Sequence, residues 1–180
     1  MHHHIGVQRA VMTTTHAYTG GQQLVDGPSR SFRCGRAGAA NLVPTSTGAA
    51  QGTTRAVPEL AGRFGGIAVR APIPVGSIAD IVFVANRPTS PQEVNDAFRQ
   101  EAASIQYHGI LGVSEDPLVS ADIVGDSRAA VVDLDLTRVV DDTLVKVMAW
   151  YDNEWGFTHQ MIREARSTLG VAATAAQPGR

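Results

Sequence analysis

One stretch of alternating residues, from residue 5 to residue 18, strongly limits the folds open to this chain. It is rich in β-branched residues and has Met12, Thr14 and His16 on one face, which predicts a long strand. An irregular segment rich in Gly, Ser and Arg follows, from residue 20 to residue 41. Functional side chains are often found where a strand meets a loop, because the sheet holds that position rigidly. His16 is therefore a candidate site residue, and its imidazole titrates near neutral pH.

Further strands are predicted over residues 65–74, 77–86, 132–136 and 143–151, where apolar and β-branched residues cluster. In residues 132–136, apolar side chains alternate with Asp133 and Asp135. This alternation predicts a half-exposed strand whose aspartates face solvent.

Three helices are predicted between and after these strands. The segment from Pro44 to Ala50 predicts a tight turn that opens a helix, which ends before Pro58. A capping box at residues 90–93 opens a second helix that continues to about residue 105. The third begins near residue 152 and carries an apolar stripe at Phe157 and Met161.

This arrangement of elements favours an α+β fold, with a largely antiparallel sheet and helices packed on one face. The chain has 180 residues, of which 43% are hydrophobic and 18% charged, enough for one domain with a substantial core. No GxGxxG motif follows a predicted strand, so the sequence contains no dinucleotide-binding half. We expect one domain over residues 1–170 and a frayed tail over residues 171–180.

Composition also argues against several classes of function. The formal net charge of -2 gives no support to nucleic-acid binding. No apolar run approaches the roughly 20 residues of a membrane span, so we expect no membrane partner. Cys34 is the single cysteine and cannot form an internal disulfide, which fits a reducing compartment. The histidines at positions 2–4 are assigned no metal role.

Several residues carry groups that suit anion binding, and each also has a simpler explanation. Free backbone N–H groups at the helix start after Pro44 make an anion site, but they also describe any capped helix start. Arg70 offers a bidentate fork, although a strand arginine is usually solvated. Arg33 and Arg36 could bind an anion, but they could equally be solvated charges of the loop. Asn153 could bind a ligand, but it could equally be the N-cap of the predicted third helix.

Four separated motifs occur in an order that resembles the catalytic domain of glyceraldehyde-3-phosphate dehydrogenases. They are His16-Ala-Tyr-Thr19, Pro44-Thr-Ser-Thr-Gly-Ala-Ala50, Arg70-Ala-Pro-Ile-Pro74 and Trp150-Tyr-Asp-Asn-Glu-Trp-Gly156. The similarity extends from about residue 5 to about residue 168. Any one of these motifs alone is a weak signal, whereas four in order and in matching contexts are specific.

The resemblance implies a catalytic role for His16 and phosphate-binding roles for four other residues. His16 resembles the general base that deprotonates the catalytic cysteine of the family. Thr19 and Arg70 resemble the groups that hold the phosphate of the substrate. Thr47 and Gly48 resemble the site for the attacking inorganic phosphate.

Two more positions and a loop acquire roles from the same resemblance. Arg33 resembles an arginine between the two anion sites, and in the alternative alignment that position falls on Cys34. Asn153 resembles the side chain that binds the nicotinamide carboxamide. The loop over residues 18–41 resembles one that lies at the tetramer interface of the family.

Two departures from the family pattern bear on activity. The Ser-Cys-Thr-Thr-Asn-Cys stretch that carries the nucleophile of the family is absent, and Cys34 falls in a different motif. The cofactor-binding half is also absent. A smaller difference is Phe157, where many relatives have tyrosine. We therefore expect a catalytic-domain fragment that does not turn over substrate alone.

The function implied by the resemblance is that of an NAD-dependent, phosphorylating aldehyde dehydrogenase of glycolysis and gluconeogenesis. NADP is a possible alternative cofactor. The implied partners are a small phosphorylated aldehyde and inorganic phosphate, within a cytoplasmic homotetramer of full-length chains. Two other functions stay open: an erythrose-4-phosphate dehydrogenase, and a non-catalytic assembly module that joins full-length subunits.

Overall fold

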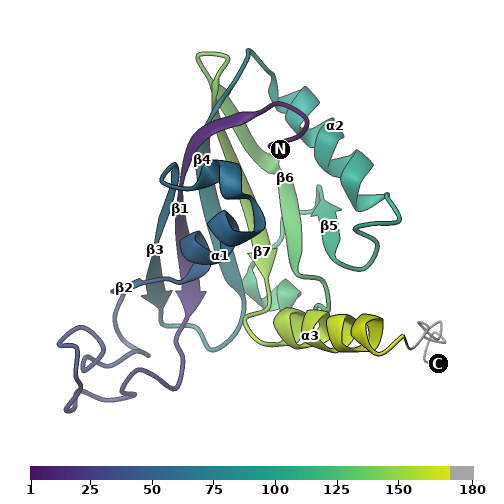
Figure 1. The fold of residues 1–180 in the computed structure, drawn as a ribbon. Helices are drawn as coiled ribbons and strands as arrows, with labels where there is room; N and C mark the ends of the chain where they lie inside the picture. Colours follow the sequence, from purple (N-terminus) through teal and green to yellow (C-terminus); the bar gives the residue numbers. More distant parts are fainter. Residues whose placement is uncertain (171–180) are drawn as a thin grey trace.

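A computed structural model describes residues 1–170, in which seven strands form one sheet (Figure 1). The order across the sheet is β2-β3-β1-β4-β7-β6-β5. The strands are β1 (Val7–Ala17), β2 (Val43–Ser46), β3 (Phe64–Ala71), β4 (Ser77–Ala85), β5 (Leu111–Ser114), β6 (Ala130–Val140) and β7 (Leu144–Tyr151). The helices are α1 (Ala49–Ala56), η1 (Pro58–Leu60), α2 (Pro91–Ala102), η2 (Ser120–Ile123) and α3 (Trp155–Thr168). The predicted tail over residues 171–180 lies outside the described residues.

The sheet is mixed, with antiparallel pairs in the majority. Among the described residues, four pairs of strands are antiparallel, and two pairs, β1–β3 and β5–β6, are parallel. A parallel pair needs a long connection between its strands. Between β1 and β3 this connection consists of the irregular loop, β2 and α1.

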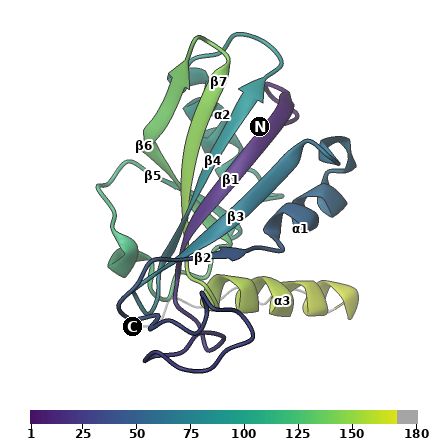
Figure 2. The same cartoon turned by 90° about the vertical axis from the view of Figure 1, so that its left-hand side faces the viewer.

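The main hydrophobic core lies on the face of the sheet that α2 and the α1–η1 segment cover. Phe83 and Val145 contribute from the central strands, Val94 from α2 and Leu60 from η1. All four side chains are buried. Helix α3 instead lies across the end of the sheet, as Figures 1 and 2 show. The prediction of helices on one face therefore describes α1 and α2 but not α3.

Three elements differ between the prediction and the structure. Residues 43–46 form β2, which pairs with β3, so the predicted turn at Pro44 is instead an edge strand. Strand β5 was not predicted, because its four residues are too few to show the alternation of apolar and polar side chains. Helix α2 ends at Ala102 rather than near residue 105, where the side chain of Ile105 is 95% exposed. The Ser104 hydroxyl bonds the Glu101 carbonyl at 2.7 Å there and stabilises a turn.

Helix α3 carries its apolar stripe on the outside. The side chains of Phe157, Met161 and Ile162 are between 53% and 65% exposed, and Gly156 is the buried residue of this helix. The stripe is present as predicted, but within the described residues it does not pack against the core. An exposed apolar face of this kind is typical of a surface that another protein segment covers.

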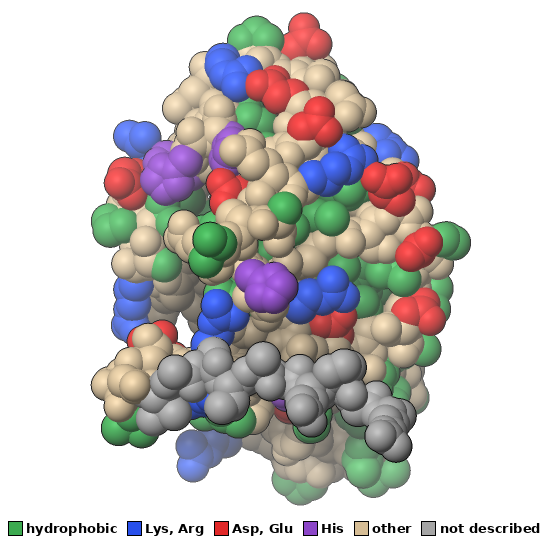
Figure 3. Space-filling model, turned by 90° about the vertical axis from the view of Figure 1, so that its right-hand side faces the viewer, with side chains coloured by type: hydrophobic (Ala, Val, Ile, Leu, Met, Phe, Trp, Pro, Cys, Tyr) green, Lys and Arg blue, Asp and Glu red, His purple; other side chains and the backbone are tan. Residues whose placement is uncertain are grey.

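The outer face of α2 is polar and of mixed charge. Arg99 pairs with Asp96 at 2.8 Å and also contacts Glu115, while Arg87 pairs with Glu93 at 2.5 Å. Figure 3 shows this side of the molecule, where acidic and basic side chains alternate over the surface. Exposed pairs like these contribute little to stability. This face has the character of an ordinary solvated surface.

No helix within residues 1–170 is long and apolar enough to cross a membrane. The same residues contain no group of three or more His, Cys, Asp or Glu side chains arranged to hold a metal ion.

Candidate functional site

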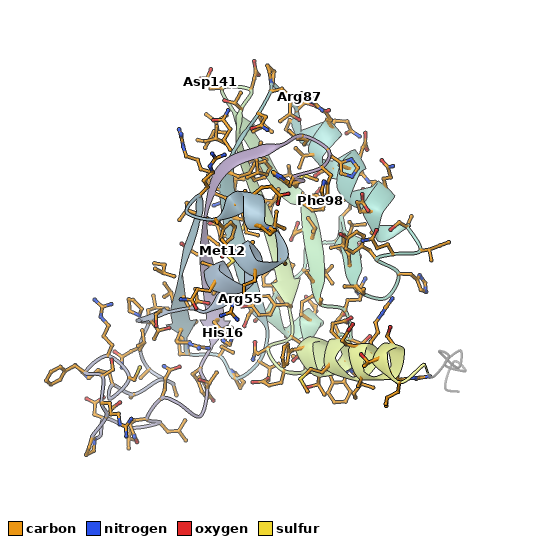
Figure 4. The ribbon with its side chains drawn as sticks, in the orientation of Figure 1. Met12, His16, Arg55, Arg87, Phe98 and Asp141 are labelled. Atoms are coloured by element: carbon orange, nitrogen blue, oxygen red, sulfur yellow. The ribbon has the colours of Figure 1, made fainter. Side chains whose placement is uncertain are left out.

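His16 and Arg70 lie next to each other near the ends of two parallel strands. The register pairs His16 of β1 with Arg70 of β3, 54 positions later in the chain. The Arg70 Nη1 atom contacts His16 Nδ1 and also donates to the Ala17 carbonyl at 3.2 Å. Figure 4 shows His16 at the lower end of its strand, below Met12. Strand pairing therefore brings together two groups that the sequence places far apart.

The Nδ1 atom of His16 faces both a donor and an acceptor. It lies 2.7 Å from the Ala17 carbonyl oxygen, while the Arg70 guanidinium approaches the same nitrogen. A neutral ring with its proton on Nε2 accepts from Arg70 at Nδ1, whereas a ring with a proton on Nδ1, neutral or charged, donates that proton to Ala17. The presence of a proton on Nδ1 of His16 is thus linked to the position of Arg70.

The surroundings of His16 favour the neutral ring. Burial lowers the pKa of His16 below its ordinary value of 6.5, and the positive charge of Arg70 lowers it further. The bond to Ala17 and the negative charge of Glu154 act in the opposite direction but do not reverse the shift. At neutral pH the imidazole is therefore uncharged, and in the form with its proton on Nδ1 the Nε2 atom can accept a proton.

Tyr151, at the end of β7, packs against the imidazole. The two ring centroids are 5.9 Å apart in an edge-to-face arrangement. The Tyr151 hydroxyl bonds Thr14 Oγ1 at 2.6 Å, which ties β7 to β1 across β4. Burial raises the pKa of Tyr151 above its ordinary value of 10.0, so the phenol stays protonated. The histidine ring therefore has a rigid aromatic wall on one side.

Asn153 follows β7 and reaches the same end of the sheet. Its Oδ1 atom accepts a hydrogen bond from Ser77 Oγ, at the start of β4. Ser77 Oγ also accepts from the backbone N–H of Ala17 at 3.2 Å, directly after His16. The Asn153 Nδ2 atom is buried and has no hydrogen-bond partner among the described residues. The site therefore contains one unused amide donor close to the histidine strand.

Thr47 and Gly48 are connected to this site through β2 and α1. Gly48 is the N-cap of α1, and Thr47 Oγ1 accepts the N–H of Ala49 at 3.1 Å. The register pairs Ser46 with Ile67, three residues before Arg70 on β3. No hydrogen bond among the described residues joins Thr47 to His16 or Arg70. Thr47 and Gly48 thus follow the strand that pairs with β3, without a hydrogen bond to Arg70 among the described residues.

Thr19 lies three residues beyond His16, where the loop begins. Its carbonyl accepts the N–H of Gln22 at 2.9 Å, and its own N–H donates to Gln22 Oε1 at 3.3 Å. The backbone of Thr19 is therefore fixed by Gln22, while its half-buried side chain lies next to the end of β1.

Arg33 is not brought together with His16 and Arg70. It lines a hollow of about 520 Å³ together with Cys34, Pro44 and Ile67. Side chains alternate across a strand, so Ile67 lies on the opposite face of β3 from Arg70. Cys34 lines the same hollow, so neither alignment of this loop brings a side chain to the histidine. In this single chain the proposed third anion-binding group lies apart from the others.

Asp152 is a structural residue of this region that the sequence analysis missed. Its carboxylate is buried and accepts the N–H of Gly125 at 2.9 Å, of Glu154 at 3.0 Å and of Trp155 at 2.8 Å. It therefore holds the start of α3 against the loop before β6. The sequence places it directly before Asn153, where a turn before a helix was the available signal.

Ser77, Thr14 and Tyr151 were also missed as site residues. Ser77 looks like an ordinary strand start, and Thr14 lies in a run of three threonines. Tyr151 is within a recognised motif but had no role assigned. Their roles depend on distances between strands, which no local pattern contains.

The pairing of Arg70 with a neutral histidine predicts anion binding. We expect sulfate at ten times its dissociation constant to stabilise the chain by about 1.4 kcal/mol, or about 3–6 °C in Tm for a protein of this size. Arg70→Ala should abolish the rise because it removes the guanidinium. Arg63→Ala is the matched control, since it removes an exposed arginine just before the same strand. Equal sulfate responses in wild type and Arg70→Ala, measured by thermal unfolding, would remove Arg70 from the anion site.

Comparison with known proteins agrees with the motifs. The family model "Glyceraldehyde 3-phosphate dehydrogenase, C-terminal domain" matches residues 1–153. Glyceraldehyde-3-phosphate dehydrogenase 2 of Streptomyces arenae is 47% identical over 162 residues, which cover 90% of this chain and 48% of the relative. The Haloarcula vallismortis glyceraldehyde-3-phosphate dehydrogenase is 46% identical over 157 residues, which cover 87% of this chain and 46% of the relative.

A chloroplast relative gives the same result. Glyceraldehyde-3-phosphate dehydrogenase A of Chlamydomonas reinhardtii is 45% identical over 163 residues, covering 91% of this chain and 43% of the relative. The chain spans about half the length of the curated relatives it matches. Its matched residues, sheet and motifs all correspond to one domain of these oxidoreductases. The chain therefore belongs to the glyceraldehyde-3-phosphate dehydrogenase family, as a member of its C-terminal domain.

Proposed function

We propose that this chain is the catalytic domain, over residues 1–170, of an NAD-dependent, phosphorylating glyceraldehyde-3-phosphate dehydrogenase. The observation that carries the proposal is the contact between His16 and Arg70 near the ends of adjacent strands. A neutral base beside a fixed positive charge suits an aldehyde that carries a phosphate group. The base can take a proton while the guanidinium holds the phosphate.

His16 acts as the general base in this proposal. Its lowered pKa keeps the ring neutral at physiological pH, and Tyr151 restricts the orientation of the ring. The ring takes the proton of the nucleophilic thiol, which makes the thiolate that attacks the aldehyde carbon. The protonated ring returns this proton to the aldehyde oxygen as the thiolate adds, and it takes the proton back from that hydroxyl when the hydride leaves.

Arg70 and Thr19 hold the phosphate of the substrate, and Thr47 and Gly48 hold the attacking inorganic phosphate. Arg70 has its guanidinium at the site, and Thr19 lies three residues beyond the base. Thr47 and Gly48 lie at the start of α1, where backbone N–H groups suit an anion. Arg33 belongs to this set only if the loop over residues 18–41 changes its position on assembly, because in the single chain it faces a separate hollow.

Asn153 contacts the carboxamide of the nicotinamide. Its buried Nδ2 atom is a donor without a partner among the described residues, which fits a carbonyl acceptor on the ligand. NAD is the proposed cofactor, with NADP as the alternative. When bound, the nicotinamide supplies hydride acceptance, and the residues of this chain orient it and manage protons.

The proposal includes assembly with a cofactor-binding half and with further subunits in a cytoplasmic homotetramer. The exposed apolar stripe of α3, at Phe157 and Met161, supports an additional covering segment. Val11 and Ile67, on the sheet face opposite the core, are 54% and 50% exposed and support a second covered surface.

A chimera tests the proposal. It joins this chain to the part of the Streptomyces arenae relative that precedes its match. We expect phosphate-dependent reduction of NAD with glyceraldehyde-3-phosphate, at a higher kcat/KM than with erythrose-4-phosphate. The reduction of NAD is followed by absorbance, with and without inorganic phosphate. A folded, tetrameric chimera without this activity would contradict the proposed function.

A further inference from the structure

We propose that Ser77 is a positioning residue that fixes two parts of the site at once, the strand end at His16 and the amide of Asn153. This inference rests on the proposed function, in which His16 is the base and Asn153 contacts the nicotinamide. Neither the motifs nor the family resemblance assigned a role to Ser77.

Ser77 connects the end of β1 to the segment after β7, in addition to the Thr14–Tyr151 bond that joins the two strands. Its hydroxyl accepts the N–H of Ala17 at 3.2 Å and donates to Asn153 Oδ1. Ala17 follows His16 on β1, and Asn153 follows β7. Ser77 itself is 1% exposed at the start of β4, the strand between these two. One hydroxyl thus joins the base strand to the cofactor-contacting side chain.

The single proton of this hydroxyl sets the orientation of the asparagine amide. The N–H of Ala17 can only donate, so the Ser77 oxygen must accept there. The Ser77 proton points at Asn153 and selects the amide oxygen rather than the NH2 group, while the neighbouring Tyr151 hydroxyl bonds Thr14. The Nδ2 atom is consequently directed away from Ser77 and has no partner within residues 1–170. Asn153 therefore presents a donor, and not an acceptor, to a ligand.

This polarity predicts which ligand group the site prefers. A donor from Asn153 pairs with a carbonyl oxygen, such as that of a carboxamide, and a misoriented amide would leave both groups unpaired. Discrimination by an oriented polar group exceeds discrimination by shape alone. Ser77 therefore contributes to specificity through Asn153 and does not itself touch the ligand.

The conformation of Gly76 directs the chain into β4 just before Ser77. Gly76 has φ of +90°, and a Cβ atom at this position would lie 2.2 Å from the Ser120 carbonyl oxygen. Only glycine permits both the positive φ and this close approach. The Ser120 backbone thus lies too close to Gly76 for any side chain there, and the following residue enters β4 with its hydroxyl toward Ala17 and Asn153.

The experiment compares wild type, Ser77→Ala, Ser77→Thr and the control Ser127→Ala, whose exposed serine lies outside the site. NMR of the ¹⁵N-labelled chain measures hydrogen exchange of the Ala17 amide and the side-chain signals of Asn153. In Ser77→Ala we expect Ala17 to exchange about tenfold faster, because its N–H loses its acceptor. The two Asn153 NH2 signals should move toward each other, because the amide is free to turn. Ser77→Thr should restore both, because it keeps the hydroxyl.

A second measurement separates this inference from the proposed function. Nicotinamide mononucleotide, titrated into the wild type, should shift the Asn153 NH2 signals, and Ser77→Ala should lose that response. A wild type that does not respond, with Ser77→Ala still altering Ala17 and Asn153, would overturn the cofactor role of Asn153 and keep Ser77 as the positioning residue. Unchanged Ala17 exchange and Asn153 signals in a folded Ser77→Ala variant would overturn the role of Ser77.

Discussion

In the chimera with a cofactor-binding half, replacing His16 by Asn lowers kcat by about 10²–10⁴-fold, the usual contribution of a positioned general base. Asparagine can occupy a similar volume and can still accept from Arg70, so the strand end keeps its contacts. It cannot take a proton at neutral pH. The loss should therefore appear in kcat, with KM for the aldehyde changing much less. Steady-state kinetics of NAD reduction measure both.

His108→Asn is the matched control for this variant. His108 is an exposed histidine after α2, far along the chain from the site, and it should leave kcat unchanged. The pH profile adds a second readout. Because burial and Arg70 lower the pKa of His16, wild-type activity should persist below pH 6.5 and fall only at more acid pH. A His16→Asn chimera with wild-type kcat would refute the assignment of the base.

Asp152→Ala has the largest expected effect on stability. The change removes one buried carboxylate and leaves three N–H groups, those of Gly125, Glu154 and Trp155, without an acceptor. We expect a loss of about 2–4 kcal/mol in the free energy of unfolding. Urea denaturation measures it. Asp135→Ala is the control, since Asp135 is exposed on β6, and its loss should change stability by less than about 0.5 kcal/mol.

The stability that Asp152 supplies should also depend on pH. Burial alone would raise the pKa of this carboxyl, but its three N–H donors outweigh burial and hold the pKa below 3.8. A carboxyl with a lowered folded pKa stabilises the fold above its unfolded value and loses that contribution as the pH falls through the folded one. The difference in stability between wild type and Asp152→Asn should therefore be constant above about pH 5 and shrink below about pH 4. A difference that stays constant down to pH 2 would contradict this origin.

The five longer strands and the position of His16 were predictable, because their signals are local. The alternation over residues 5–18 fixes both the strand and the face of His16, and the structure has β1 at Val7–Ala17. The capping box likewise predicts the start of α2, where Ser90 Oγ accepts the N–H of Glu93 at 3.2 Å. Arg70 was found by its motif, but its contact with His16 depends on the parallel pairing of β1 and β3, which no local pattern contains.

The features that the sequence could not predict depend on interactions between distant segments. Asp133 was predicted to face solvent, but it is buried, because the indole N–H of Trp150 donates to its Oδ2 at 3.0 Å. The stripe at Phe157 and Met161 was correctly recognised as apolar, yet periodicity does not tell whether the covering surface lies within the same chain. Arg33 lies in a loop without a repeating pattern, so only the folded loop reveals which face of the sheet it reaches.

The shared register of β1 and β3 has a consequence for folding. A shift of either strand by a single residue would turn its side chains to the other side of the sheet, and the imidazole and guanidinium would then be separated by the backbone layer. A one-residue shift therefore removes the contact between His16 and Arg70 completely rather than weakening it. In the proposed mechanism, proton transfer therefore becomes available only after this long-range pairing has formed correctly, and a chain with shifted strands would lack the site even when its secondary structure is complete.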